Sequence, residues 1–430
     1  MNRVHLLFPV LTGLLLSACT VITPDTARQR VTDAAKASGA TDLVIANRAD
    51  GGLNVTGKLS GNNFALRVPP KWNGQTLLYA HGYVTPKAGA VEFPALVDKD
   101  PSTANGDSGL LTTAYNQGYA TANSEYAKVG YAVKEGIEAT KNLREFMAKA
   151  GSTRQFISGT SMGGNIVVGL IEKYPQDFVG ALSMCGVVSG WRNEMQYLMD
   201  FRVVYDYLTK GTPYALPGGG DAMTVNPAYN QQAVNASVGG LFGAAGKGDE
   251  QAKAIIGQLA RVTGVQPDPL SFIVPLSVTI DGLNDLLSTM NGLGYSNVGK
   301  VYAGSADDAA LNAGVQRLTV SPESSAYLDA NYTPTGKFNA KLLAFHNLSD
   351  PLVPYMLQEQ YTRIVQNAGN SNNFVAQVVD ARPVNMADLS KSGPTHCYFT
   401  PEQMTFAWNE LTTWVNKGVR PKDGLNITKP

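Results

Sequence analysis

The sequence predicts an α/β fold in which a mostly parallel sheet is flanked by helices. Short apolar runs alternate with loops and amphipathic stretches, a pattern typical of parallel strands joined by helices. The chain has 430 residues, 44% of them hydrophobic, which is enough for a large core. Lys and Arg total 34, as do Asp and Glu, and no basic stretch is interleaved with aromatics. This balance argues against a nucleic-acid partner.

The strand–helix alternation occupies two blocks, residues 51–186 and 337–430, which we expect to form one core. Strands are expected at 76–80, 119–123, 155–158, 179–184, 341–345 and 374–379, and helices at 131–150, 165–173, 355–367 and after Pro401. Residues 187–336 break the alternation with aromatic helical pieces, several prolines and a run of three glycines. A loop of that length without structure would be unusual, so we predict a large helical cap inserted over the sheet.

The N-terminal residues are expected to be a targeting signal. Arg3 precedes an apolar run over residues 6–16, which is shorter than the roughly 20 residues of a membrane-spanning helix. The run ends in Leu-Ser-Ala-Cys at Cys19, which resembles a bacterial lipobox. That resemblance implies a signal peptide at 1–18, a lipidated Cys19 and a membrane anchor in the cell envelope, with Thr20 favouring the outer membrane. An ordinary signal of a periplasmic or secreted protein is the alternative. Residues 19–50 are polar and Ala-rich, and we expect them to form a tether with some helix.

A nucleophile motif is the main chemical signal. Gly159-Thr160-Ser161-Met162-Gly163 fits G-x-S-x-G, in which the serine sits on a strained turn and the glycines let strand and helix approach closely. A β-type run ends just before the motif and a helical stretch follows it. This context predicts that Ser161 is a nucleophile.

The serine requires a base, and the chain has four histidines. His5 lies in the signal, whereas His81 and His346 end strands upstream of turns. His396 stands in a loop between the last strand and the last helix, and we therefore predict it as the base.

An acid should orient that base. Asp350 follows the penultimate strand in an Asp-Pro turn, and Asp380, at the end of the last strand, is the rival. Taking Asp350, the order along the chain is Ser, Asp, His, which is the order found in α/β-hydrolases.

With these motifs the chain resembles an α/β-hydrolase from about residue 55 to the C-terminus, the cap excluded. The resemblance implies an oxyanion hole formed by the backbone N–H of Met162 and by a donor from the loop after His81-Gly82, which we expect to be the N–H of Tyr83. A plain tight turn at this His-Gly pair is the alternative.

The cysteines support a narrower resemblance. Once Cys19 is set aside, Cys185 and Cys397 form an even pair, which favours one disulfide over two free thiols in an oxidising compartment. His396-Cys397 is similar to the tannase and feruloyl-esterase group, in which the cysteine after the histidine bridges one beside the serine. Thr160 occupies that second position here, so the resemblance implies Cys185 as a substitute.

These observations predict a serine hydrolase that cleaves small carboxylic esters through an acyl-enzyme. The alternatives are a prolyl-peptidase-type serine peptidase and a non-catalytic lipid-anchored binding protein of the envelope. A peptidase would use cap acids to bind an amino terminus, the candidates being Asp200, Asp206, Asp221 and Asp281. The cap aromatics would line a pocket for an apolar or aromatic acyl group or form the cap's own core: Trp191, Tyr197, Tyr205, Tyr207 and Tyr214. No metal motif or phosphate loop occurs, so no cofactor is expected.

Overall fold

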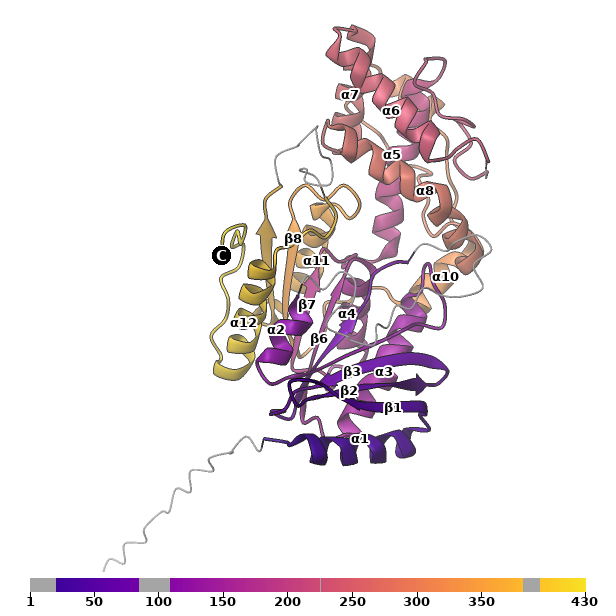
Figure 1. The fold of residues 1–430 in the computed structure, drawn as a ribbon. Helices are drawn as coiled ribbons and strands as arrows, with labels where there is room; N and C mark the ends of the chain where they lie inside the picture. The colour runs from indigo at the N-terminus through magenta and orange to yellow at the C-terminus, as the bar shows by residue number, and fades with distance from the viewer. Residues whose placement is uncertain (1–20, 85–108, 225, 382–394) are drawn as a thin grey trace, which may run out of the picture.

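A computed structural model describes residues 21–84, 109–224, 226–381 and 395–430. Its centre is a nine-stranded sheet in the order β1-β2-β3-β5-β4-β6-β7-β8-β9 (Figure 1). The strands are β1 (Thr41–Asn47), β2 (Leu53–Leu59), β3 (Asn62–Val68), β4 (Gln75–Ala80), β5 (Ala120–Ser124), β6 (Arg154–Thr160), β7 (Gly180–Met184), β8 (Lys341–Asn347) and β9 (Phe374–Val379). β1, β2, β3 and β5 pair antiparallel, and all pairs from β5 to β9 are parallel. The predicted mostly parallel sheet is confirmed.

Helices cover both faces of this sheet because the buried strands are apolar on both sides. Leu78 and Ile157 face one hydrophobic cluster, whereas the adjacent Leu77 and Phe156 face the other. The first face carries α1 (Pro24–Ser38), α3 (Val133–Lys149), α4 (Met162–Lys173) and α11 (Tyr355–Asn367), and the second carries α2 (Leu110–Asn116) and α12 (Pro401–Lys417). The expected helices at 131–150, 165–173, 355–367 and after Pro401 correspond to α3, α4, α11 and α12.

The segment between β7 and β8 is helical, and Figure 1 shows α5–α8 gathered beyond one end of the sheet. Its helices are α5 (Trp191–Thr209), α6 (Gln231–Gly246), α7 (Glu250–Thr263), α8 (Pro269–Met290), α9 (Asp308–Gly314) and α10 (Pro322–Asn331). Side chains of Asn230, Asp249 and Asp268 cap α6, α7 and α8, as short polar residues do at helix starts. We call this segment the cap. Among the described helices none is by itself long and apolar enough to span a membrane, and the two bent halves of α8 meet that test only together.

The N-terminal region contains the helix expected within the tether, and in addition it packs on the core. Residues 24–38 form α1, which buries Ala27, Val31 and Ala34 against the core, and β1 pairs with β2 at the edge of the sheet. The helix forms because Thr23 caps it, a proline occupies its first turn and its small apolar residues recur at helical spacing. The lipobox at Cys19 and the signal at 1–18 lie outside the described residues.

Candidate active site

Ser161 lies on a sharp turn between β6 and α4. Its backbone has φ 55° and ψ −123°, a strained conformation for a residue with a side chain. A Cβ at Gly159 would lie 2.8 Å from the Ala80 carbonyl oxygen, and one at Gly163 would collide with the same atom. The two glycines are therefore required for β4, β6 and α4 to meet, and they hold the serine hydroxyl at the carboxyl edge of the sheet.

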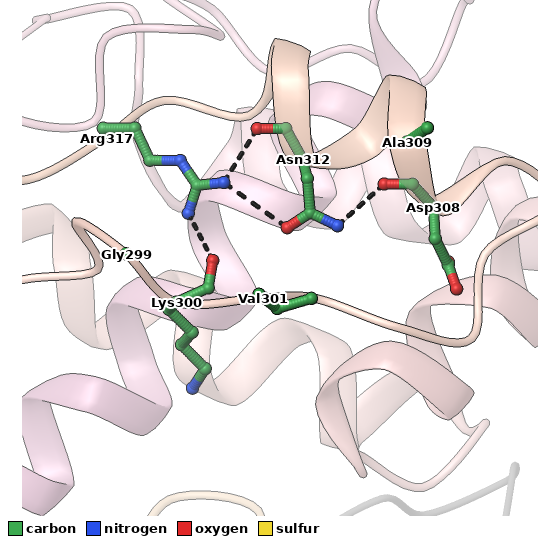
Figure 2. Close-up of a pocket in the computed structure, with 7 residues that line it drawn as sticks. All are labelled: Gly299, Lys300, Val301, Asp308, Ala309, Asn312 and Arg317. Carbon is green, nitrogen blue, oxygen red and sulfur yellow. Dashed lines mark hydrogen bonds between the residues drawn. The ribbon is translucent and has the colours of Figure 1, made fainter.

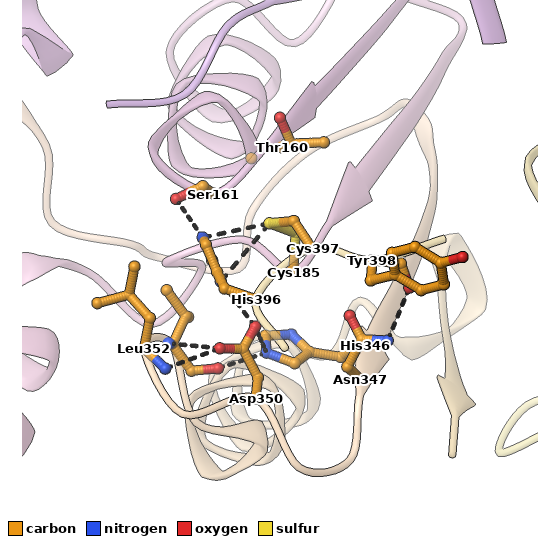
Figure 3. The surroundings of a disulfide bond; sticks show 12 residues. Thr160, Ser161, Cys185, His346, Asn347, Asp350, Leu352, His396, Cys397 and Tyr398 are labelled. Carbon is orange, nitrogen blue, oxygen red and sulfur yellow. Dashed lines mark hydrogen bonds and ion pairs between the residues drawn. A yellow bond between two sulfur atoms is a disulfide. The ribbon is translucent and has the colours of Figure 1, made fainter. Parts of the chain in front are cut away.

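The three residues predicted as a triad are brought together. His396 Nε2 lies 2.8 Å from Ser161 Oγ, and His396 Nδ1 lies 2.8 Å from Asp350 Oδ2 (Figure 3). The Ser161–His396 contact joins residues 235 positions apart in the sequence. In this arrangement His396 can accept the serine proton at Nε2 while the Asp350 carboxylate accepts a hydrogen bond from Nδ1–H.

The acid is fixed by its own turn. Asp350 Oδ1 accepts hydrogen bonds from the backbone N–H groups of Leu352 and Val353, both at 2.9 Å, and its carboxylate is buried. These bonds leave Oδ2 for His396. The rival Asp380 is exposed at the end of β9, where its Oδ1 accepts from Asn426 Nδ2 at 2.8 Å. The structure therefore pairs Asp350 rather than Asp380 with the histidine.

Two further histidines are buried near this edge. His346 lies under the acid turn, where its Nε2 is 2.7 Å from the Val353 carbonyl oxygen and 3.8 Å from Asp350 Oδ2. His81 stacks on Tyr126 with ring centroids 3.8 Å apart. Burial lowers the pKa of His346, and it lowers the pKa of His81 to about 4. Both imidazoles are therefore neutral near pH 7, and His346 supports the acid turn through the Val353 carbonyl.

Met162 directly follows the serine, and the loop that carries Tyr83 passes beside it. Met162 is the first residue of α4, so its N–H has no acceptor within the helix. Gly82 passes beside the nucleophile, since a Cβ at this position would lie 3.4 Å from Ser161 Cβ and 3.9 Å from Ser161 Oγ. Tyr83 follows Gly82, and its hydroxyl donates to Asp285 at 3.0 Å. The loop after β4 thus borders the space in front of the serine hydroxyl.

A disulfide joins Cys185 and Cys397 beside the triad, with a Cα–Cα distance of 5.4 Å (Figure 3). Cys185 directly follows β7, and Cys397 directly follows the predicted base. The structure therefore contains the bridge expected from the substitution of Cys185 for a cysteine beside the serine. A second contact tethers the same loop, because Asn347 Nδ2 donates to the Tyr398 carbonyl oxygen at 3.0 Å.

The two cysteines of the disulfide also belong to a group of potential metal ligands. Among the described residues, one group of potential metal ligands is close enough together, namely Cys185, His396 and Cys397. Its two sulfurs are bonded to each other and its imidazole bonds Ser161 and Asp350. The potential ligand atoms of this group are therefore already engaged, the two sulfurs in the disulfide and the imidazole with Ser161 and Asp350.

The acids proposed for amine recognition have other partners. Asp200 accepts from the hydroxyls of Tyr295 and Tyr302 and pairs with Lys300, and Asp206 pairs with Arg202 at 2.8 Å. Asp221 accepts backbone N–H groups of its own turn. The side chain of Asp281 lies outside the described part. A hollow of about 490 Å³ in the cap, lined by Lys300, Asp308 and Arg317 among others, contains none of the triad residues (Figure 2).

Two of the five cap aromatics belong to the cap's own core. Tyr205 is fully buried against Phe201, and Tyr214 is buried and bonded to Asp249. Tyr197 differs, because its hydroxyl donates to the Pro351 carbonyl oxygen at 2.8 Å and its ring borders a pocket of about 130 Å³ at the acid turn. Tyr197 therefore joins the cap to the acid turn.

Glu194 was missed by the sequence analysis. It is 2% exposed at the start of α5, and its Oε2 has no hydrogen-bond partner within the described ranges. Burial, with a smaller contribution from Asp350, raises the pKa of this carboxyl well above its usual range. Burial therefore favours the protonated form of this carboxyl relative to that of an exposed glutamate. An acid in the first turn of a helix gives no signal of burial in the sequence.

Comparisons with solved structures return remote neighbours. Feruloyl esterase B from Aspergillus oryzae is 14% identical, with 89% of this chain and 86% of that chain covered and a TM-score of 0.48. The rice cell wall degrading esterase LipA from Xanthomonas oryzae is 14% identical, with coverages of 91% and 96% and a TM-score of 0.41. Proline iminopeptidase from Mycobacterium smegmatis is 12% identical, with coverages of 85% and 100% and a TM-score of 0.41. No protein-family model and no curated protein matches the chain. The strand order of the sheet and the strand–Ser161–helix turn are those of the α/β-hydrolase fold, and this chain has that fold.

Proposed function

We propose that this chain is a serine hydrolase that cleaves carboxylic esters through Ser161, His396 and Asp350. The observation that carries the proposal is the continuous contact from Ser161 Oγ through both His396 nitrogens to Asp350, with 2.8 Å at each step. A hydroxyl so placed is activated by the imidazole, and the carboxylate stabilises the imidazolium that forms.

The reaction would run in two halves. Ser161 Oγ attacks the ester carbonyl carbon while His396 Nε2 takes its proton, and the backbone N–H groups of Met162 and Tyr83 stabilise the oxyanion. His396 then returns the proton to the departing alcohol, which leaves the acyl group on Ser161. Water attacks this acyl-enzyme with His396 again as base, and the acid and the free serine are released.

Two features support an ester over a peptide. The cap acids Asp200, Asp206 and Asp221 are bonded within the cap, and Glu194 is buried, which raises the pKa of its carboxyl. Three of these acids thus already have partners within the cap, and the fourth is buried. We propose esters with apolar or aromatic acyl groups as the substrates, because the acid turn is bordered by an aromatic cap residue.

We also propose that Cys19 carries a lipid that anchors the chain in the cell envelope. The support is the sequence ending at Cys19. Labelled palmitate should be incorporated by the wild type and not by Cys19→Ser, and incorporation by both would contradict the anchor.

The experiment on activity uses the purified protein with a fluorophosphonate probe and, separately, with p-nitrophenyl esters, feruloyl esters and aminoacyl amides. We expect labelling at Ser161 and turnover of the esters. Ser161→Ala should lose both, with a rate loss of roughly 10⁴-fold or more. Ser158→Ala is the matched control, because it removes a buried hydroxyl from the same strand that bonds only the Leu78 carbonyl.

The outcomes separate the candidate functions. Turnover of amides alone would replace the esterase by a peptidase. A folded protein that neither labels nor turns over any substrate would contradict catalysis and favour a binding protein.

A further inference from the structure

One cap carboxylate reaches the loop that follows β4. Asp285, in α8, accepts through Oδ2 from the Tyr83 hydroxyl at 3.0 Å and from the Tyr131 backbone N–H at 2.5 Å. Tyr83 and Asp285 are 202 residues apart in the sequence. The contact therefore exists only while the cap is seated on the core.

The surrounding residues are shaped for this contact. Gly130 has φ 80°, and a Cβ there would lie 2.6 Å from Asp285 Cγ, so a larger residue would displace the carboxylate. The Gly130 N–H donates to the Val84 carbonyl oxygen at 2.8 Å, which ties this segment to the loop after β4. Lys128 Nζ donates to Thr289 Oγ1, one turn along α8, at 2.6 Å. Gly130 and Lys128 thus help to hold α8 close to the loop after β4.

The loop held in this way is the one beside the nucleophile. A Cβ at Gly82 would lie 3.3 Å from the Thr160 carbonyl oxygen and 3.4 Å from Ser161 Cβ, so the backbone here has little space to move toward the serine. Movement away from it is opposed by the Tyr83–Asp285 bond. A displacement of about 1 Å at such a position typically costs about 100-fold in rate.

We infer that Asp285 is a positioning residue through which the cap sets the oxyanion side of the active site. Its carboxylate holds Tyr83 and Tyr131 and thereby fixes the loop that faces the developing negative charge. When the cap swings away to admit substrate, the Tyr83 hydroxyl is released, and the site is complete again only once the cap returns. The inference rests on the proposed ester hydrolysis.

The test is a double-mutant cycle on Asp285→Ala and Tyr83→Phe, each of which leaves the backbone N–H of residue 83 in place. Each single variant should lower kcat by roughly 10- to 100-fold with little change in KM. The double variant should lose no more than Asp285→Ala alone, because the hydrogen bond removed by Tyr83→Phe is one of the two that Asp285→Ala removes. Lys173→Met is the matched control: it removes another contact between core and cap, from Lys173 Nζ to the Asn331 carbonyl oxygen, that touches neither Tyr83 nor Asp285, and its kcat should stay at the wild-type value.

Hydrogen exchange gives a readout that is independent of catalysis. Exchange of the amides at 82–84 and 130–131 should rise in Asp285→Ala and in Tyr83→Phe but not in Lys173→Met. Additive losses of kcat, an unchanged kcat in Tyr83→Phe, or an equal loss in Lys173→Met would overturn the inference. If the wild type itself neither labels nor turns over esters, the proposed function fails, and unchanged exchange in the two tether variants would then overturn the tether as well.

Discussion

At the residue scale, the two carboxylate oxygens of Asp350 have different roles, one in holding its own turn and one in orienting His396. One oxygen accepts two backbone N–H groups of its own turn, and the other accepts His396 Nδ1–H. His346 holds the same turn from below through the Val353 carbonyl oxygen. The acid is thus oriented before substrate arrives, which is the purpose of such an arrangement in catalysis.

Replacing Asp350 tests this division. Asp350→Asn keeps the shape, but an amide N–H facing Nδ1 favours the imidazole tautomer whose Nε2 already carries a proton and cannot take the serine's. We expect kcat to fall by roughly 10³- to 10⁴-fold. Asp380→Asn is the control, because that exposed carboxylate bonds Asn426 and should be silent in ester kinetics. A larger loss in the Asp380 variant than in the Asp350 variant would refute the assignment of the acid.

At the element scale, the disulfide holds in place the loop that carries the predicted base. His396 lies on a loop before α12 rather than on a strand, so its placement depends on what holds the loop. Cys185, at the end of β7, is fully buried and anchors Cys397 to the sheet. The bond closes a span of 212 residues, which restricts the unfolded chain.

Reduction should therefore affect both stability and activity. We expect treatment of the wild type with a phosphine reductant to lower the free energy of unfolding by about 2–4 kcal/mol, and to lower kcat because His396 loses its anchor. Thermal unfolding and ester kinetics with and without reductant provide the measurement. A Cys185→Ala/Cys397→Ala variant should resemble the reduced wild type and be insensitive to reductant. Finding both thiols free by non-reducing mass mapping would end this explanation.

At the scale of the whole molecule, buried neutral histidines link stability to pH. The folded protein holds the pKa of His81 at about 4, whereas its ordinary value is 6.5. Between these values the unfolded chain binds a proton that the folded chain does not, so stability is lost as the pH falls from 6.5 toward 4. The full effect of His81 is about 3 kcal/mol.

Chemical denaturation at pH 7 and pH 5 measures this contribution of His81 to the free energy of unfolding. His81→Gln should lose less stability than the wild type between the two pH values, because its side chain does not titrate. His346 and the carboxyls remain in both proteins, so their contributions cancel in the difference. Parallel losses in the two proteins would show that His81 does not carry the effect.

Also at the scale of the whole molecule, the sequence was least informative about the structure of the N-terminal region and the cap. Residues 24–38 read as polar and Ala-rich, yet small apolar side chains on one face of α1 pack on the core. The antiparallel strands β1 and β2 were likewise not located. Half-buried amphipathic segments depend on a partner surface for their stability, and that surface is invisible in the local pattern.

The sequence by itself predicted the alternation of strands and helices, the elbow at Ser161 and His396 as the base, and it left Asp380 as a rival to Asp350 for the acid. It could do so because buried parallel strands are continuous apolar runs and because the elbow demands glycines at set positions. Only the tertiary structure decided that Asp350 rather than Asp380 faces the base, that His346 lies beneath the acid, that Glu194 is buried, and that Asp285 holds Tyr83. Each of these is a contact between segments distant in sequence or a burial made by such segments, and its energy depends on distance and desolvation that no local pattern encodes.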